Sequence, residues 1–474
     1  MTVLYFLICS AILALSVNFV HRAWYRTTAG ALYICGHLAL SCHAFMNPNA
    51  IDSVYFKFDA LATLLNGLLS VILVPVFMHT SLYLDRHVKS PAMKGRFLSL
   101  MMLLASALSG IYFTDNFVVM WVCLEVSTVT VTFLIFHERY TDALEAAWKY
   151  LFISSFGVTL AFVGILFLSV QGHEGTQVSL SITHLNGIAQ KLDPLFLKVA
   201  FILLLTGYSI KMNIFPLYAA AIDAKTAAPF PVNALTSTAL INGGFIAIAR
   251  IYAIISKTDS ALWAQHILLI VGLASLSIAA FQLFKVKRFK RLFAFSSMEH
   301  MALVAIALSL GKAGQVAALL HLTLHTLAKT GMFLSFGQIR AFYQSGWIRD
   351  TGDYMKMNGF GAIVFLLGLL TITAIPPSGL FYSELLLFKA LLASHHYAVA
   401  LILFFLLTVI IYLMFKYAMQ LLFEPLPPGF NPENAIKNRW EPVSQLVLFL
   451  LTIYLAYFPP PFFTRLFQAA LQAL

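Results

Sequence analysis

Apolar stretches of roughly 20 residues, each long enough to cross the ~30 Å core of a bilayer as a helix, follow one another along the whole chain. Short polar loops separate them; the longest lie at 171–194 and 423–441. A window of about 20 residues predicts about fourteen transmembrane helices, one of them broken. No polar segment is long enough for a domain outside the membrane. We therefore expect an all-α polytopic membrane protein.

The composition agrees with this pattern. Hydrophobic residues make up 60% of the 474 residues and charged residues 10%, whereas about a quarter of the residues of a soluble domain are charged. Basic residues gather in alternate loops, as in 85–96 and 285–291. Because such loops face the cytoplasm, the pattern predicts both termini on the other side. The net charge of +11 thus indicates membrane orientation and not a nucleic-acid partner.

No cofactor motif stands out. The four cysteines form no CxxC pair, and neither a GxxxxGK[ST] sequence nor a Gly-rich loop between a strand and a helix is present. Iron–sulfur, zinc, disulfide and nucleotide sites are poorly supported. We expect no cofactor and no metal in this chain.

One apolar segment, LFLKVAFILLLTGYSIKMNIFP at 195–216, carries Lys211 and then Pro216. A charge at the centre of a bilayer costs ~2.5–3.5 kcal/mol on insertion scales. Pro216 removes a backbone donor and breaks the helix. A buried lysine beside a broken helix is typical of an ion or proton site. The alternative is that Lys211 reaches the interface from a helix end and Pro216 marks a loop.

Further charged residues lie inside apolar spans. Glu125 lies in the predicted fifth span and Glu299 in the tenth. A carboxyl group inside the membrane needs a partner from another span, for proton exchange or for a structural ion pair. In the broken twelfth span Pro376 and Pro377 unwind the helix, and Glu384 follows on its second half.

The predicted eleventh span carries His321, His325 and Lys329 at i, i+4 and i+8. This spacing places them on one helix face, and a row of imidazoles can relay protons near neutral pH. A metal held by the two histidines is an alternative, but no carboxylate lies on that helix and Lys329 would repel a cation. Ordinary core histidines are the third interpretation.

Charged and broken elements recur five spans apart, which suggests two repeats inverted in the membrane. The expected segments are an N-terminal three-helix part (1–90), a first five-helix repeat (91–256), a second repeat (257–422), and a loop with the last span (423–474).

Six segments form distinctive motifs: LEAAWKYLFISS at 144–155, KMNIFP at 211–216, AAPFPVNAL at 227–235, SSMEHM at 296–301, HLTLHTLAK at 321–329 and PPSGLFYSE at 376–384. Together they resemble the antiporter-like membrane subunits of complex I, Mrp cation/proton antiporters and group 4 hydrogenases. The segments SSMEHM and HLTLHTLAK are most similar to hydrogenase-4 component F.

The resemblance implies a fourteen-helix fold with two inverted five-helix repeats, in a prokaryotic cytoplasmic (inner) membrane. It implies a subunit that moves H⁺, or Na⁺, beside other antiporter-like subunits and a hydrophilic redox module. The redox centre then belongs to the complex and not to this chain. The proton-transfer residues it implies are Glu125, Lys211, His321, His325, Lys329 and Glu384, and we add Glu299 from its position inside the tenth span.

The chain departs from the family pattern after its seventh span, where Asp223 is kept but a following His and Glu are missing. Many members of the family carry a Lys or His within the eighth span, whereas here Asn242 is the only strongly polar side chain in the middle of that span. Two other functions within the family stay open as alternatives to a redox-driven subunit: an Mrp-type antiporter subunit and the membrane subunit of an inorganic-carbon uptake complex. The departure in the eighth span also keeps a purely structural scaffold open.

Overall fold

The computed structural model describes residues 1–20, 22–174, 177–426, 430, 438 and 440–474. Within these ranges the chain is nearly all helical, which confirms the expected fold class. One short antiparallel hairpin pairs β1 (His173–Glu174) with β2 (Gln177–Val178). The predicted loop at 171–194 thus carries a hairpin and a short helix, and most of the interior of the predicted loop at 423–441 lies outside the described residues.

The chain forms two compact units. Unit 1 consists of Met1–Val232, Ala239–Ile267 and Pro461–Leu474, and unit 2 of Asn233–Thr238 and Leu268–Pro460. The four segments expected from the sequence are repeats and not compact units. The two compact units do not test the division into repeats, which stays a prediction.

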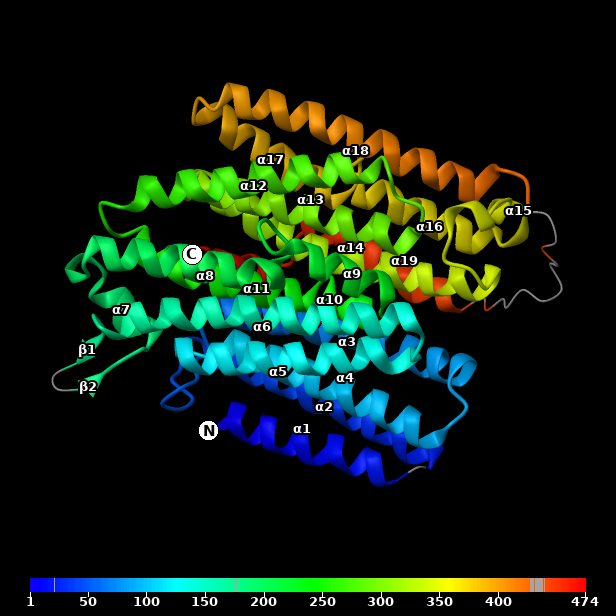
Figure 1. The fold of residues 1–474 in the computed structure, drawn as a ribbon, viewed down its shortest axis with the longest axis horizontal. Helices are drawn as coiled ribbons and strands as arrows, with labels where there is room; N and C mark the ends of the chain where they lie inside the picture. Colours follow the sequence, from blue (N-terminus) through cyan, green and yellow to red (C-terminus); the bar gives the residue numbers. More distant parts are fainter. Residues whose placement is uncertain (21, 175–176, 427–429, 431–437, 439) are drawn as a thin grey trace. The chain divides into compact units, whose positions relative to one another are not determined.

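Unit 1 holds the first half of the helices and the last one (Figure 1). Its helices are α1 (Thr2–Phe19), α2 (Ala23–Met46), α3 (Ala60–His87), α4 (Pro91–Phe113), α5 (Phe117–Ile135), η1 (Phe136–Glu138), α6 (Thr141–Ser169), α7 (Ile182–Gly187), η2 (Ala189–Lys191), α8 (Pro194–Met212), α9 (Tyr218–Ala227), α11 (Ala239–Ile255) and α20 (Pro461–Leu471).

Two helices, α10 (Phe230–Thr236) and α12 (Ala261–Leu283), contain residues of both units. The helices of unit 2 are α13 (Phe289–Ser309), α14 (Lys312–Tyr343), η3 (Ile348–Asp350), α15 (Tyr354–Met357), α16 (Gly359–Ile372), α17 (Gly379–Ala393), α18 (Tyr397–Phe423) and α19 (Glu441–Tyr457).

Local sequence fixes where several helices begin. The carboxylate of Asp59 accepts from the backbone of Ala62 at 3.0 Å and caps α3. Asn116 caps α5 in the same way, and Asp193 caps α8. Such caps satisfy N–H groups that lack a partner in the first turn of a helix.

The number of spans differs from the expectation. In the part of the chain that the structure describes, eleven helices are long and apolar enough to cross a membrane, or up to twelve if the bent pair α19–α20 counts as one. The predicted count of about fourteen is not confirmed. The predicted twelfth span is divided into α16 and α17, of 14 and 15 residues, so each half is short. The polar α14 is also not among the eleven.

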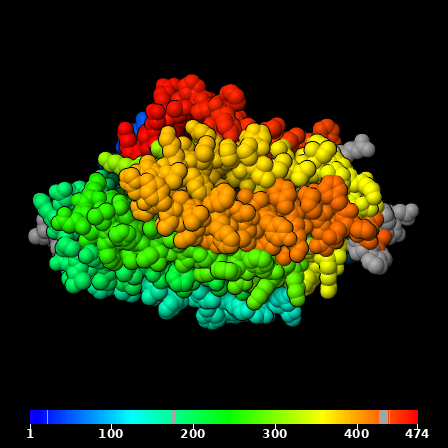
Figure 2. All heavy atoms as spheres, turned by 90° about the horizontal axis from the view of Figure 1, so that it is seen from above, coloured from blue at the N-terminus to red at the C-terminus, as the bar shows by residue number. Residues whose placement is uncertain are grey.

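Large apolar side chains cover the outside of α18, the orange helix in Figure 2. Leu401 is 71% exposed, and Phe404, Phe405 and Tyr412 are exposed to a similar degree. A continuous exposed apolar surface marks a membrane or protein contact. This face therefore agrees with a helix that borders lipid or another membrane protein.

Candidate proton-transfer sites

Lys211 lies in the last turn of α8 and is only 2% exposed. Its Nζ donates to Thr128 Oγ1 of α5 at 2.6 Å and to the Tyr150 hydroxyl of α6 at 3.2 Å. Nζ also lies 5.2 Å from the centroid of the Tyr150 ring, close enough for a cation–π contact. The ammonium group is therefore held by neutral groups from two other helices.

The backbone explains how Lys211 reaches this place. A Cβ added to Gly157 of α6 would lie 2.9 Å from the Gly207 carbonyl of α8, so these two helices can approach closely only because both residues are small. Helix α8 ends at Met212, and Asn213 takes the left-handed conformation with φ 61°. Three residues thus separate the end of the helix at Met212 from Pro216. Ser209 binds the backbone beyond the end of the helix: its carbonyl accepts a hydrogen bond from Ile214 N, and its hydroxyl accepts one from Leu217 N.

Glu125 lies on α5 one turn before Thr128, so both side chains share a helix face. Ser155 donates to Glu125 Oε1 at 2.9 Å. The other oxygen, Oε2, is buried and has no hydrogen-bond partner among the described residues. The sequence suggests a direct pair between Glu125 and Lys211, but the described contacts of Lys211 go to the two neutral hydroxyls instead.

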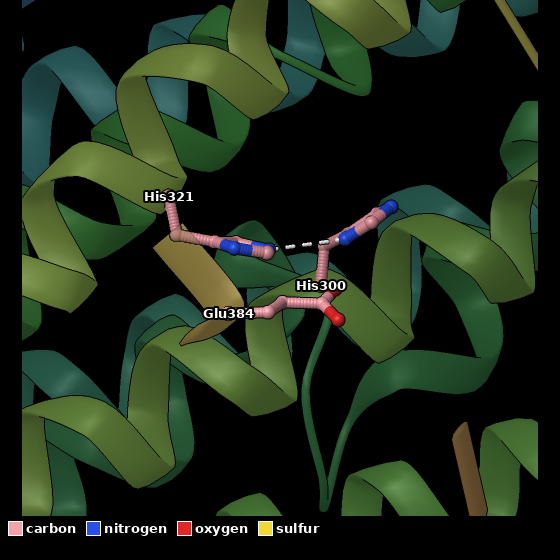
Figure 3. Close-up of side chains that lie close together, drawn as sticks. All are labelled: His300, His321 and Glu384. Atoms are coloured by element: carbon pink, nitrogen blue, oxygen red, sulfur yellow. Dashed lines mark hydrogen bonds between the residues drawn. The ribbon is translucent and has the colours of Figure 1, made fainter. Parts of the chain in front are cut away.

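In unit 2 the predicted polar stripe of α14 is buried: His321 is 3% exposed, and His325 and Lys329 are 0% exposed. His300 of α13 faces the two histidines, with ring centroids 5.1 Å from each. His300 Nδ1 and His321 Nε2 lie 3.0 Å apart (Figure 3). His321 Nδ1 lies 2.9 Å from Ser383 Oγ of α17.

These contacts give the hydrogen bonds a direction. Ser383 donates its one proton to the Leu380 carbonyl at 2.8 Å, so it must accept from His321 Nδ1–H. The Nε2 atom of a neutral His321 is then an acceptor, and His300 Nδ1–H donates to it. We assign the tautomer of His321 from this network.

Glu384 of α17 lies beside His300 and His321 (Figure 3). One ligand atom each of His300, His321 and Glu384 lies within 4.8 Å of the others, a set that could hold a metal ion. The carboxylate that α14 lacks thus comes from α17. The hydrogen bond from His300 to His321 already satisfies the two facing nitrogens, so we treat the trio as a proton-sharing cluster.

Glu299 and Lys329 complete the unit 2 group. Ser296 donates to Glu299 Oε2 at 3.3 Å. Lys329 Nζ lies 3.5 Å from the Phe293 carbonyl oxygen and 5.7 Å from the Phe293 ring centroid. Like Lys211, Lys329 is a buried ammonium whose described contacts are a neutral oxygen and an aromatic ring.

The predicted residues therefore form two groups. Glu125 and Lys211 lie in unit 1, and Glu299, His321, His325, Lys329 and Glu384 lie in unit 2. Asn242 is buried on α11, and Asp223 lies on α9. Four further residues contact these groups but are not among the residues predicted from the sequence: Thr128, Tyr150, His300 and Ser383.

Comparison with known proteins decides the family. The family model described as NADH:quinone oxidoreductase/Mrp antiporter, TM, matches residues 114–411. The chain belongs to this family. It is an antiporter-like, multi-span membrane protein, as the motifs in the sequence indicate.

Relatives come from several branches of the family. The chain is 30% identical to the hydrogenase-4 component F homolog of Methylacidiphilum infernorum, over 75% of this chain and 74% of that protein. It is 26% identical to NADH-quinone oxidoreductase subunit N of Halorhodospira halophila, over 80% and 77%. It is also 26% identical to a Na(+)/H(+) antiporter subunit of Alkalihalophilus pseudofirmus, over 88% of this chain but 54% of that protein.

Two solved structures share the fold. A chain of the archaeal membrane-bound sulfane sulfur reductase has a TM-score of 0.85 at 20% identity, covering 99% of this chain and 96% of that one. A chain of the Mrp complex from Dietzia sp. has a TM-score of 0.83 at 17% identity, covering 99% and 95%. These relatives are parts of multi-subunit membrane complexes.

Proposed function

We propose that this chain moves protons across the membrane as a subunit of a redox-driven complex of the hydrogenase-4 or NADH–quinone oxidoreductase type. The observation that carries the proposal is the buried Lys211 ammonium, which binds Thr128 and Tyr150 while the Glu125 carboxylate lies one turn from Thr128. A charge in a low-dielectric site without a contacting counter-ion is costly. A small movement of Lys211 between Thr128 and Glu125 would therefore change how firmly it holds a proton.

In this mechanism the proton leaves Lys211 when Glu125 and Lys211 separate. Buried water carries it to the α14 residues, where Lys329 and the histidines accept it. It then passes to Glu384 and leaves the membrane domain. The chain holds no redox centre in this proposal, and a hydrophilic module supplies the electron transfer.

The basic loops orient the chain in the cytoplasmic membrane. Lys and Arg concentrate at 85–96 and 285–291, and by the positive-inside rule both loops face the cytoplasm. Both termini then lie on the opposite side. Other antiporter-like subunits and the hydrophilic redox module are the proposed partners, the latter on the cytoplasmic side.

The test is proton transport by the complex in reconstituted vesicles. Lys211→Met should abolish coupled proton movement, whereas Lys198→Met should leave it unchanged. Lys198 lies on the same helix, contacts the Trp263 ring at 5.6 Å and is outside both groups. His325→Ala should slow transfer. Wild-type pumping by Lys211→Met would refute the mechanism, and unchanged rates in His325→Ala would make that histidine a core residue.

A second candidate is an Mrp-type cation/proton antiporter subunit. The similarity to the Na(+)/H(+) antiporter protein of Alkalihalophilus pseudofirmus over 88% of this chain and the shared fold of the Mrp complex chain favour it. The two candidates differ in their driving force. Proton movement that follows an imposed Na⁺ gradient without electron transfer would support the antiporter.

A further inference from the structure

A ring of buried polar side chains joins α2, α3 and α4 in unit 1, apart from the residues considered so far. Its members are His37 and Ser41 of α2, Asn66 and Ser70 of α3, and Ser109 of α4. His37, Asn66 and Ser109 are completely buried, and Ser70 is 2% exposed. The ring lies before residue 114, where the family match begins.

Five hydrogen bonds close the ring. On one side His37 Nδ1 lies 2.6 Å from Ser70 Oγ, and Ser70 Oγ lies 2.6 Å from Ser41 Oγ. Asn66 Nδ2 donates to Ser41 Oγ at 2.7 Å. On the other side His37 Nε2 lies 2.9 Å from Ser109 Oγ, which donates to Asn66 Oδ1 at 2.8 Å.

The chemistry of each group fixes the direction of these bonds. Asn66 Oδ1 can only accept, so Ser109 uses its one proton there and must accept from His37 Nε2–H. Asn66 Nδ2 donates to Ser41, which donates to Ser70, which donates to His37 Nδ1. At rest His37 is then neutral with its proton on Nε2.

The same atoms allow a second arrangement. The backbone carbonyl oxygen of Asn66 lies 3.1 Å from Ser70 Oγ and 3.4 Å from Ser41 Oγ. If Ser70 turns its hydroxyl proton toward this carbonyl, its lone pair can accept from a protonated Nδ1. Every ring member keeps its hydrogen bonds, and no heavy atom has to move. A buried polar network that is satisfied in both states leaves no unpaired group in either one, so the cost of the second state is that of burying the imidazolium charge.

We propose that His37 is a further proton-binding site of this chain, apart from the two groups described above. Ser41 is the half-buried member of the ring, and in this proposal the proton enters there. Ser41 takes up a proton and passes its own to Ser70, and Ser70 passes its own to His37 Nδ1. Each oxygen ends with one proton, His37 gains one, and release follows the same steps in reverse.

The surroundings keep the resting site neutral. Helix α1 has no Asp, Glu, Lys, Arg or His, and it presents Phe6 edge-on to His37 with ring centroids 5.6 Å apart. On α2 the Tyr33 ring lies 6.2 Å from His37, and its hydroxyl binds Ser106. The remaining charged or titratable His, Asp, Lys and Arg side chains of α2, α3 and α4 are Arg26, His43, His79, Asp85, Arg86, His87, Lys94 and Arg96.

The site is tested directly by nuclear magnetic resonance of the full chain with labelled histidines. His37→Gln identifies the His37 signal. As the pH is lowered over the range in which the protein stays folded, His37 should change from the neutral Nε2–H form to the doubly protonated ring. Tyr33→Phe removes a neighbouring hydroxyl outside the ring and should leave this titration unchanged. A ring that stays neutral while the protein remains folded overturns the proposal.

The role of His37 in transport rests on the proposed function. His37→Gln and the milder Ser41→Ala should each lower proton flux in vesicles by about tenfold or more, as expected for a positioned proton-transfer group. Wild-type flux in both variants would remove His37 from the route. If the unaltered complex moves no protons, the proposed function fails, and the resonance titration still decides whether His37 binds a proton.

Discussion

Lys211 Nζ donates to Thr128 Oγ1 at 2.6 Å, although Glu125 lies one turn away on the same face of α5. Thr128 therefore holds the ammonium close to a carboxylate without an ion pair between them. Both partners of Lys211 are neutral hydroxyls, so the group can lose its proton without leaving a bound anion behind. This geometry makes Thr128 a positioning residue for the proposed proton transfer.

Thr128→Val should impair transport because it keeps the shape of the side chain and removes the acceptor. A hydrogen bond to a charged group contributes about 1.5–3 kcal/mol, which corresponds to a loss of roughly 10- to 100-fold in rate. Proton flux in vesicles measures the effect. Thr130→Val is the matched control, because Thr130 donates only to the Val126 carbonyl of its own helix. Equal fluxes in the two variants would contradict the role of Thr128.

Ser383→Ala should release the tautomer of His321. The hydroxyl that accepts from His321 Nδ1 is lost, so the ring can place its proton on either nitrogen and the bond from His300 weakens. We expect a mixture of tautomers by nuclear magnetic resonance and a proton flux about tenfold lower. Ser309→Ala, which removes a hydroxyl bound to its own helix at Ile306, should change neither. A single unchanged tautomer in Ser383→Ala would refute the assignment.

The ion pair of Asp59 with Arg250 predicts a stability effect in unit 1. Both residues are 9% exposed, and Arg250 NH2 donates to Asp59 Oδ2. Arg250→Met leaves the carboxylate unpaired, which should destabilise the fold by about 3–5 kcal/mol. The double variant with Asp59→Asn keeps an oxygen for the α3 cap and should be more stable than Arg250→Met alone. Thermal unfolding in detergent gives both values, and a less stable double variant would argue against the pair.

The sequence predicted the helical membrane fold and the buried stripe of α14, because both follow from hydrophobicity and from the spacing of residues within one helix. It could not predict that Lys211 binds Thr128, since these residues are 83 positions apart. Helix periodicity shows which residues share a face but not which helix that face meets. The same reason explains why His300 was absent from the predicted proton-transfer residues, although it follows Glu299 directly.

The sequence does carry a signal of the His37 ring. His37 and Ser41 are separated by four positions, and so are Asn66 and Ser70, so each pair lies on one helix face. Polar pairs at this spacing in apolar spans indicate helix faces that meet inside the protein. Hydropathy averages over the span and hides them.

Gly244 of α11 offers a test of the Lys211 site that leaves its polar groups in place. A Cβ at Gly244 would lie 2.7 Å from the Lys211 carbonyl carbon and 2.9 Å from Met212 Cα. These are backbone atoms of α8, so Gly244→Ala must shift the end of that helix together with Lys211. A misplacement of about 1 Å can cost roughly 100-fold in a positioned reaction. We therefore expect Gly244→Ala to fold and to lose most of its proton flux.

The neighbouring glycine provides the control for that prediction. A Cβ at Gly243 would meet Ile111 side-chain atoms at 3.5 and 3.6 Å, which is ordinary van der Waals contact. Gly243→Ala adds the same methyl group to the same helix and should transport protons at the wild-type rate. Flux in vesicles and thermal unfolding in detergent distinguish a displaced Lys211 from a general loss of stability. Because Gly244→Ala keeps Lys211, Thr128 and Tyr150, a wild-type flux would show that transport tolerates a shift of the lysine backbone.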